Sequence, residues 1–358
     1  MSYLLASYKC SEMAKKKSQV HMLDHSKAKV KLLEEYLRKY LNIIANDGFT
    51  KRIDVFDLFC GEGIYENDGE GSPLVILKAL KDLHYVNIAN TKNIPKVDLF
   101  LNDKDDLKIE KLKTIIEERK LHDNKFGRLI FRSKKYEDIE IRASDIKKLL
   151  KSKKSEVLLF LPTQFMYRFD ERGTPEALIK ILEELVDLKD WTPNKSVYQF
   201  INQFKEALKS YLGTNFYVDT FSIEKDNATV FCLFFFSSHI RGFEKMIETK
   251  WQIDKDEGKG WSYDGTSSLF SIFKTNLLEE KIIELLSSKS KVYNGEIYEF
   301  TLRSGFLPTH AVEILASLQA TNKLDVLTDD ASKIRKGAFY INYENYRQSP
   351  KKVSFKLK

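Results

Sequence analysis

The stretch Ile-Asp-Val-Phe-Asp-Leu-Phe-Cys-Gly-Glu-Gly-Ile-Tyr, residues 53–65, decides the fold. Its first part is apolar and lacks proline, which is typical of a buried strand in a parallel sheet. Gly61 and Gly63 then allow a tight turn and a close approach of the backbone to a ligand. A helix after such a turn directs its free N–H groups to the same spot. The stretch therefore predicts the first strand and first loop of a nucleotide-binding α/β domain.

The composition is that of an ordinary globular protein. The 358 residues are 42% hydrophobic and 31% charged, enough for two domains and a sizeable core. No run approaches the roughly 20 apolar residues of a membrane helix. No apolar run follows the lysines at 15–17 either, so we expect a cytoplasmic protein without a secretory signal. The three cysteines, Cys10, Cys60 and Cys232, lie far apart and predict neither a disulfide framework nor a metal site.

The net charge of +7 favours a phosphate-bearing partner. A lysine-rich composition produces the same balance by itself, because net charge says nothing about clustering. Both interpretations remain open at this point.

The segment before the opening strand predicts a helix over residues 24–46, with apolar residues at spacings of three and four. Asp24 or Ser26 is the expected N-cap, and Asp47-Gly48 ends the helix. His25, Lys27 and Lys29 lie at its start, near the glycine loop, and are candidate contacts to nucleic acid or a partner. The alternative is a solvated helix end. Residues 1–22, polar and lysine-rich, are expected to form an N-terminal arm.

The segment after the glycine loop carries candidate ligand residues. Ser72 precedes Pro73 and a helix over residues 74–83. A second strand, residues 97–101, ends in Asn102 and Asp103. A carboxylate at that strand end accepts hydrogen bonds from both ribose hydroxyls of a nucleotide. The alternative role is a cap for the helix at 106–120; we assign Asp103 as ligand and Asp105 as cap.

The next elements complete a doubly wound sheet. We expect a third strand at 128–132, a helix at 139–152 and a fourth strand at 156–161. Glu137 and Asp138 lie in the loop after the third strand, where they either border the base of the nucleotide or are ordinary polar loop residues. The end of the fourth strand should lie beside the first loop, at the switch point where ligands bind. There Tyr167 and Arg168 are expected in the pocket, and Phe165 and Phe169 in the core.

Helices are expected at 175–188 and 196–212, and an antiparallel hairpin at 215–223 and 228–237 closes the sheet. A helix at 239–252 ends this domain, which spans residues 23–254, and residues 255–274 form a linker. Residues 275–347 predict a winged helix-turn-helix: helices at 277–286, 294–301 and 308–321, then a hairpin of 323–327 with 337–341. Residues 348–358 are expected as a basic tail. Phosphate contacts are predicted for Lys323, Lys333, Arg335 and Lys336. A protein-binding winged helix is the alternative.

The glycine loop has the form D-x-F-x-G-x-G from Asp57 to Gly63 and lacks the third glycine of dinucleotide enzymes. Together with the acidic strand end and the late antiparallel hairpin, it resembles the class I S-adenosylmethionine-dependent methyltransferases. The resemblance implies that Asp57 lies near the methionine amino group, Gly61 under the cofactor and Asp103 at the ribose. The expected cofactor-binding residues are Phe56, Asp57, Phe59, Gly61, Gly63, Ser72, Asn102, Asp103 and Leu161.

A second resemblance covers residues of about 20–347. The run His25-Ser26-Lys27-Ala28-Lys29, the glycine loop, Gly71-Ser72-Pro73-Leu74 and the C-terminal winged helix look like the three-Cys-motif partner family. That family implies a methyltransferase-like protein encoded beside a three-cysteine protein of radical S-adenosylmethionine type, in a bacterial or mobile-element setting.

One departure bears on catalysis. Amino-methyltransferases that act on DNA carry a D/N-P-P-Y/F motif after the fourth strand, whereas this chain has Leu161-Pro162-Thr163-Gln164-Phe165. Pro162, Gln164 and Tyr167 are the candidate catalytic residues. The sequence thus favours a methyltransferase that acts on nucleic acid. A non-catalytic cofactor-binding adaptor is the alternative, and the missing third glycine argues against a dinucleotide oxidoreductase.

Overall fold

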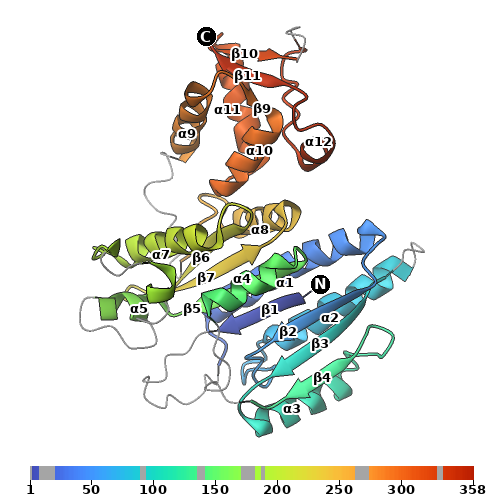
Figure 1. The fold of residues 1–358 in the computed structure, drawn as a ribbon. Coiled ribbons are helices and arrows are strands. Elements are labelled where there is room, and N and C mark those ends of the chain that lie inside the picture. Colours follow the sequence, from blue (N-terminus) through green and yellow to red (C-terminus); the bar gives the residue numbers. More distant parts are fainter. Residues whose placement is uncertain are drawn as a thin grey trace. The chain divides into compact units, whose positions relative to one another are not determined.

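An eight-stranded mixed sheet organises the larger part of the chain (Figure 1). Its order is β4-β3-β2-β1-β5-β7-β6-β8. Strands β1 to β5 run parallel, while β7 runs antiparallel to its neighbours β5 and β6. This is the predicted α/β sheet with its late antiparallel hairpin. The strands are β1 (Ser2–Ser7), β2 (Arg52–Asp57), β3 (Lys96–Asn102), β4 (Leu129–Arg132), β5 (Ser155–Leu161), β6 (Tyr217–Asp226), β7 (Thr229–Ser237) and β8 (Gly260–Trp261).

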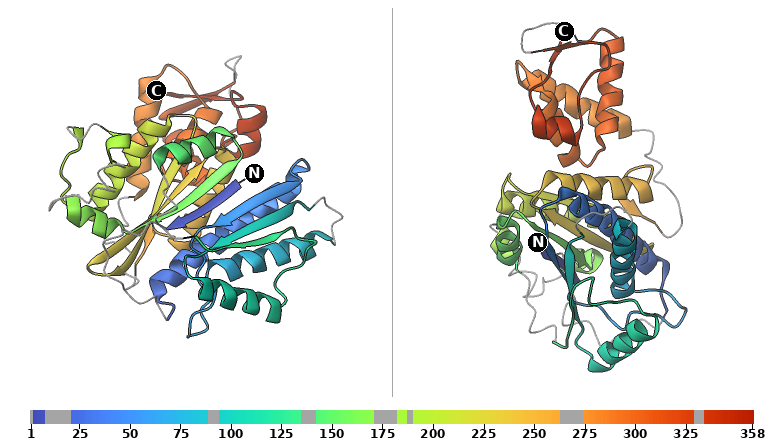
Figure 2. Two further views of the ribbon diagram at one scale, coloured as in Figure 1. Left: turned by 60° about the horizontal axis from the view of Figure 1, so that its bottom comes forward. Right: turned by 90° about the vertical axis from the view of Figure 1, so that its right-hand side faces the viewer.

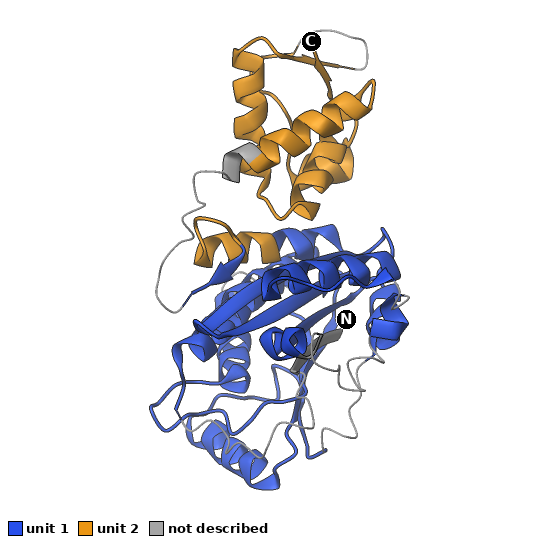
Figure 3. Ribbon diagram, turned by 90° about the vertical axis from the view of Figure 1, so that its left-hand side faces the viewer, with its two compact units in different colours: residues 1–245, 259–265 blue, residues 246–258, 266–358 orange. Residues whose placement is uncertain are grey.

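The structure is a computed structural model that describes residues 2–7, 21–88, 94–134, 142–170, 182–186, 190–262, 274–328 and 334–358. The chain divides into two units (Figure 3). The first comprises residues 1–245 and 259–265, and the second comprises residues 246–258 and 266–358. Glu137, Asp138, Phe169 and most of the helix expected at 175–188 lie outside the described residues or side chains.

Strand β1 corrects the prediction for the N-terminus. Residues 2–7 do not belong to an arm but lie between β2 and β5, with Leu4 opposite Phe56 on one side and Val157 on the other. The run Tyr3-Leu4-Leu5-Ala6 is too short to show a periodicity, although it has the apolar character that a central parallel strand requires. Because β1 separates them, β2 and β5 are not neighbours, and the expected direct contact of their ends is wrong. At about 4.8 Å per strand, roughly 10 Å separates them.

Helices cover both faces of this sheet (Figure 2). The core on one face includes α4 (Ala143–Lys151), α5 (Thr163–Asp170) and α7 (Val197–Leu212), which pack with alternate β5 residues such as Leu159. On the other face, Tyr36 of α1 (Asp24–Asp47) and Phe243 of α8 (Ile240–Ile253) contact the ring of Phe235. Helix α1 begins without the expected side-chain cap, since Leu23 occupies the N-cap position. The remaining helices are α2 (Ser72–Ile88) and α3 (Asp106–Glu118).

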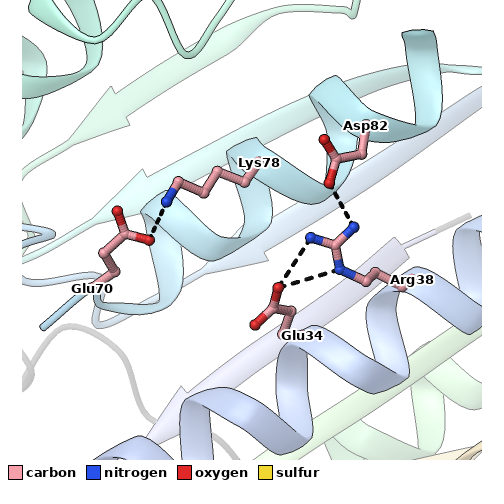
Figure 4. A network of polar contacts seen from close by, with 5 residues as sticks. All are labelled: Glu34, Arg38, Glu70, Lys78 and Asp82. Atoms are coloured by element: carbon pink, nitrogen blue, oxygen red, sulfur yellow. Dashed lines mark hydrogen bonds and ion pairs between the residues drawn. The ribbon is translucent and has the colours of Figure 1, made fainter. Parts of the chain in front are cut away.

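Polar contacts tie α1 to α2 (Figure 4). The Arg38 guanidinium of α1 donates to Asp82 of α2 at 2.6 Å and to Glu34 at 3.0 Å. Lys78 of α2 is paired with Glu70 in the loop before that helix. Exposed pairs of this kind contribute little stability, but they fix the relative register of the two helices. Lys29 lies on α1 and Ser72 is the first residue of α2.

The second unit contains the helices and sheet of a winged fold, with one correction. Strand β10 pairs with β11, not with residues 337–341 as expected, and β11 also pairs with β9. The backbone of Tyr340 is left-handed (φ 55°) and its carbonyl accepts from Asn294 Nδ2, so this segment does not continue a strand ladder. The elements are α9 (Lys274–Ser288), β9 (Val292–Tyr293), α10 (Asn294–Arg303), α11 (Pro308–Ala320), β10 (Leu324–Leu327), α12 (Tyr343–Gln348) and β11 (Ser354–Leu357).

The expected basic tail is therefore wrong for residues 354–357. The apolar residues Val353, Phe355 and Leu357 alternate with polar ones, and Val353 and Phe355 are buried. This period-two pattern is that of a half-buried strand. The neighbouring lysines concealed it in the sequence.

Candidate functional site

The opening stretch folds as predicted into a strand, a turn and a helix, with Asp57 at its centre. Asp57 ends β2 and is only 3% exposed. Its carboxylate accepts from Ser72 Oγ at 2.6 Å and from the N–H of Phe59 at 3.3 Å, so the first residue of α2 closes the turn on the end of β2. Burial raises the pKa of Asp57 to about 6, although these two donors and the charge of Lys29 oppose the shift.

The end of β3 holds the same turn from the other side. The N–H of Gly61 donates to Asp103 Oδ2 at 3.1 Å, and Asn102 Nδ2 donates to the carbonyl of Leu58 at 3.0 Å. The other Asp103 oxygen accepts from the N–H of Asp105. Asp105 in turn caps α3 by accepting from the N–H of Leu107. Of the two predicted roles, Asp105 as cap and Asp103 as ligand, the structure confirms the cap.

The two glycines of the turn serve different purposes. Both have positive φ, 67° for Gly61 and 83° for Gly63, which a side chain rarely tolerates. A Cβ on Gly63 would lie 2.4 Å from Leu74 and 2.6 Å from Leu112, so Gly63 lets α2 and α3 pack against the turn. A Cβ on Gly61 would meet no atom within 4 Å. The position that this Cβ would occupy is therefore open.

Lys29 brings a positive charge to this end of the sheet. It lies one turn into α1, is partly buried, and places Nζ 4.8 Å from the ring centroid of Phe160. Burial lowers the pKa of Lys29, and the negative charge of Asp57 opposes that shift. Across the described parts of the chain, no carboxylate lies within ion-pair distance of Lys29. Among the described residues, the Lys29 ammonium is therefore within electrostatic reach of Asp57 but bonded to no carboxylate.

Three stacked rings lie next to Lys29, and we call them the aromatic wall. His25 stacks on Phe231 at 5.6 Å between ring centroids, and Phe231 stacks on Phe160 at 5.2 Å. Burial, with Lys225 and Lys29 nearby, lowers the pKa of His25 to about 4, so the imidazole is neutral at physiological pH. Phe160 lies at the carboxyl end of β5 and Phe231 near the start of antiparallel β7, which is why the two meet. The sequence did not single out either phenylalanine, because each belongs to an apolar strand and looked like core.

Lys27, the third residue expected as a contact at the start of α1, lies apart from Lys29 and His25. Lys27 is exposed and forms an ion pair with Asp24 at 2.9 Å. It points to solvent, unlike Lys29 and His25. The structure therefore brings two of the three residues to the site.

The candidate catalytic residues follow β5. The carbonyl of Pro162 accepts from the N–H groups of Phe165 and Met166 and starts α5. Gln164 and Tyr167 are partly buried, and Tyr167 packs against the core. Exposed Arg168 donates to the carbonyl of Ala228 at 2.9 Å and so fastens α5 to the β6–β7 turn. These groups lie two strands away from Asp57, because β1 intervenes.

The side chains of three expected cofactor residues lie away from Asp57. Phe56 points to the opposite face of the sheet and stacks on Phe100 at 4.4 Å. Phe59 and Leu161 pack in the core beneath α4, α5 and α7. The residues that do gather at the turn are Asp57, Gly61, Gly63, Ser72, Asn102 and Asp103, with the charge of Lys29 nearby.

The expected phosphate contacts in the second unit are exposed. Lys323 immediately precedes β10, and Arg335 and Lys336 precede Gly337, whose N–H donates to Gln319 of α11. Lys333 lies outside the described residues.

Comparison with known families and structures bears mainly on the second unit. A family model described as a GMT-like wHTH domain matches residues 252–331. This match agrees with the predicted winged helix-turn-helix, and it ends before β11. No curated protein matches the chain.

Among solved structures, the methyltransferase domain of bacterial CtHen1-C is 14% identical, and the match covers 57% of this chain and 98% of that domain. The TM-score is 0.26, too low for the likeness to carry an argument about fold or function. Within the described ranges, no helix combines the length and apolar character needed to cross a membrane.

Proposed function

We propose that the first unit binds S-adenosylmethionine and transfers its methyl group to nucleic acid. The observation that carries this proposal is the arrangement of opposite charges around the Gly61 turn. Asp57, Asp103 and Lys29 converge at the carboxyl ends of parallel strands, where open α/β sheets bind their ligands.

The charges match the two ends of the cofactor. The methionine part carries an α-ammonium and an α-carboxylate, and Asp57 and Lys29 supply the complementary pair within electrostatic reach of each other. The ribose carries two neighbouring hydroxyls. Asp103 uses one lone pair of each oxygen for the backbone N–H groups of Gly61 and Asp105, and a carboxylate retains further acceptor capacity for those hydroxyls.

The cofactor, when bound, supplies the activated methyl group, and the protein supplies position. In the proposed complex, Asp57, Lys29 and Asp103 orient the cofactor. Phe160, Phe231 and His25 form an apolar wall beside it that suits a planar acceptor. Nucleic acid as the acceptor agrees with the winged-helix match and with the net charge of +7.

Calorimetric titration tests the cofactor assignment. We expect S-adenosylmethionine to bind and NAD not to bind. Asp103→Ala should weaken binding by about tenfold, the loss of one or two hydrogen bonds to a charged group. Asp105→Ala is the matched control: it removes the α3 cap, worth about 1 kcal/mol of stability, and should leave cofactor affinity unchanged. Absence of S-adenosylmethionine binding, or equal losses in the two variants, contradicts the assignment.

A second candidate function is a non-catalytic cofactor-binding adaptor for a three-cysteine protein of radical S-adenosylmethionine type. It is favoured by the end of β5, where Leu161 stands in place of the acid or amide that holds a target amine, and the amide of Gln164 lies at a different position. Transfer of a labelled methyl group to DNA, RNA and protein, with and without the neighbouring gene product, distinguishes enzyme from adaptor. Label in any pool supports the enzyme. Its absence from every pool, with cofactor binding intact, supports the adaptor.

A further inference from the structure

The second unit exposes one face of its three-stranded sheet, and that face is basic. Extending the β10–β11 and β11–β9 registers by one residue places Lys291 opposite Lys356, and Lys323 opposite Lys358. The N–H of Lys358 donates to the carbonyl of Lys323 at 3.1 Å, which confirms the second pair. Facing residues of adjacent strands lie on the same side of a sheet.

The opposite side of this sheet is the core. Val292, Leu324, Val326 and Phe355 alternate with the basic positions and are at most 5% exposed. The lysines therefore share the outer face, which we call the lysine face. Its members are all exposed: Lys291, Lys323, Lys351, Lys356 and Lys358. Lys351 belongs to it because its Nζ lies 5.6 Å from the ring centroid of Tyr293, the β9 residue opposite Ser354.

The described carboxylates near this face are already paired with lysines. Asp325, opposite Lys356, is paired with Lys358 at 3.3 Å. Glu296 is paired with Lys289 at 2.6 Å, and the charges of Lys289 and Lys351 lower its pKa. Lys291, Lys351 and Lys356 form no ion pair with any described carboxylate. Like charges that face each other across strands destabilise a sheet. Lys291 and Lys356 face each other and repel. An anionic partner would relieve that repulsion, so this arrangement is suited to one.

Helix α11, which would enter a major groove in a winged helix-turn-helix, lacks such groups. Its exposed residues are Thr309, Glu313, Ala316, Ser317 and Ala320. They include no cation and one carboxylate, which phosphates repel. The lysine face and α11 are thus opposite in electrostatic character.

We propose that the second unit contacts the phosphodiester backbone of nucleic acid through the lysine face and not through α11. This inference builds on the proposed function, because it assigns the surface by which the nucleic-acid substrate is held. Lysine ammonium groups contact phosphates without reading bases. Binding is accordingly independent of sequence and strongly dependent on salt.

The test measures binding of the full chain to fluorescent duplex DNA, single-stranded DNA and RNA of equal length, over a range of salt concentrations. In the triple variant Lys291→Gln/Lys351→Gln/Lys356→Gln, we expect at least a tenfold loss of affinity. The slope of log affinity against log salt should fall by about 2 to 3, since each lost phosphate contact with duplex DNA contributes about 0.9. The three nucleic acids identify which polymer is preferred.

Two controls make the test specific. Lys151→Gln/Lys153→Gln/Lys154→Gln removes the same charge from an exposed turn of the first unit and should change affinity little. Thr309→Ala/Ser317→Ala removes the hydroxyls from the exposed side of α11 and should leave affinity unchanged. Thermal unfolding verifies that each variant is folded, as expected for exposed positions.

The proposal is overturned if the wild-type chain binds no nucleic acid, if the lysine-face variant keeps its salt slope, or if the α11 variant loses affinity as much. Binding of anionic phospholipid vesicles in place of nucleic acid overturns it too. Titration of the lysine-face variant with S-adenosylmethionine separates the two proposals. Unchanged cofactor binding with lost nucleic-acid binding supports the lysine face, whereas failure of cofactor binding in the wild type counts only against the proposed function.

Discussion

Two carboxyl groups are buried in the same sheet at opposite edges. Asp57 ends β2 at the carboxyl edge, and Glu156 begins β5 at the amino edge; they are 3% and 2% exposed. Burial raises both pKa values, to about 6 for Asp57 and about 8 for Glu156. A buried carboxyl group with a raised pKa is a common mark of a functional site, so burial does not distinguish the two.

Their partners do. Glu156 accepts from the hydroxyl of Tyr36 and from Ser237 Oγ, and a Cβ on Gly242 would lie 1.9 Å from its oxygen. It is thus a neutral acid enclosed by neutral donors. Asp57 instead has the charge of Lys29 nearby and the open space beside Gly61. From this difference we infer that the Asp57 turn, where Lys29 has no bonded carboxylate among the described residues, is the better candidate for a ligand site, and that Glu156 serves the structure.

The largest expected effect is on stability, from Glu156→Leu. The change removes the carboxyl group that accepts from the hydroxyls of Tyr36 and Ser237 in the core, while Ser237 Oγ keeps the carbonyl of His239 as an acceptor at 2.9 Å. We expect the free energy of unfolding to fall by about 2 kcal/mol. Denaturant unfolding measures it. Glu156→Gln, which keeps an acceptor, should lose much less. If Glu156→Leu instead weakened cofactor binding while leaving stability intact, Glu156 would be a functional group and the comparison would fail.

The same carboxyl group should make stability depend on pH. Between its unfolded pKa of about 4.3 and its folded pKa, the folded state holds a proton that the unfolded state has released. Stability from this group is fully present below about pH 4 and is lost as the pH rises to about 8. Unfolding measured from pH 5 to 8 should therefore show a steeper decline for the wild type than for Glu156→Gln. Parallel curves would contradict the assignment.

Asp57→Asn should weaken S-adenosylmethionine binding by about 10- to 100-fold, because it removes a charged acceptor worth about 1.5–3 kcal/mol. Wild-type affinity should also fall as the pH drops below about 6, where Asp57 becomes protonated. Calorimetry at pH 5, 6 and 7.5 measures both effects. In Asp57→Asn the decline below pH 6 should disappear, and its persistence would assign the titration to another group.

Lys29→Met should weaken S-adenosylmethionine binding by about tenfold, a smaller effect because Lys29 has no bonded carboxylate among the described residues. Decarboxylated S-adenosylmethionine provides the decisive control, since it lacks the group that Lys29 is proposed to hold. The wild type and Lys29→Met should bind this analogue equally. Equal weakening for both ligands would show that Lys29 acts on the site through Asp57 or Phe160 and not through the carboxylate.

The smallest effect on cofactor binding is expected for Lys27→Met. Lys27 lies two residues before Lys29 on the same helix. Lys27 is exposed and paired only with Asp24 among the described residues, and such pairs contribute little. Cofactor affinity and unfolding should match those of the wild type within error. A loss comparable to that of Lys29→Met would mean that the general positive charge of α1, and not the placement of Lys29, attracts the ligand.

Local sequence determined much of this protein. The apolar run before Gly61, the proline after Ser72 and the Asp105 cap are short-range patterns, and they predicted β2, the turn, α2 and the start of α3 correctly. The two strand-like runs at 215–223 and 228–237, separated by a short polar turn, likewise predicted the late hairpin. These features depend on residues within a few positions of one another, which is where propensity and capping act.

Only the tertiary structure decided which distant segments pair and which side chains meet. Residues 2–7 enter the centre of the sheet, and β11 replaces the expected partner of β10. Lys29 faces Phe160 while Lys27 faces solvent. Strand pairing over tens to hundreds of residues depends on which apolar faces are left to bury, and local periodicity does not contain that information. The sequence could therefore predict the Asp57 turn, but not that Lys29 completes it or that Glu156 does not.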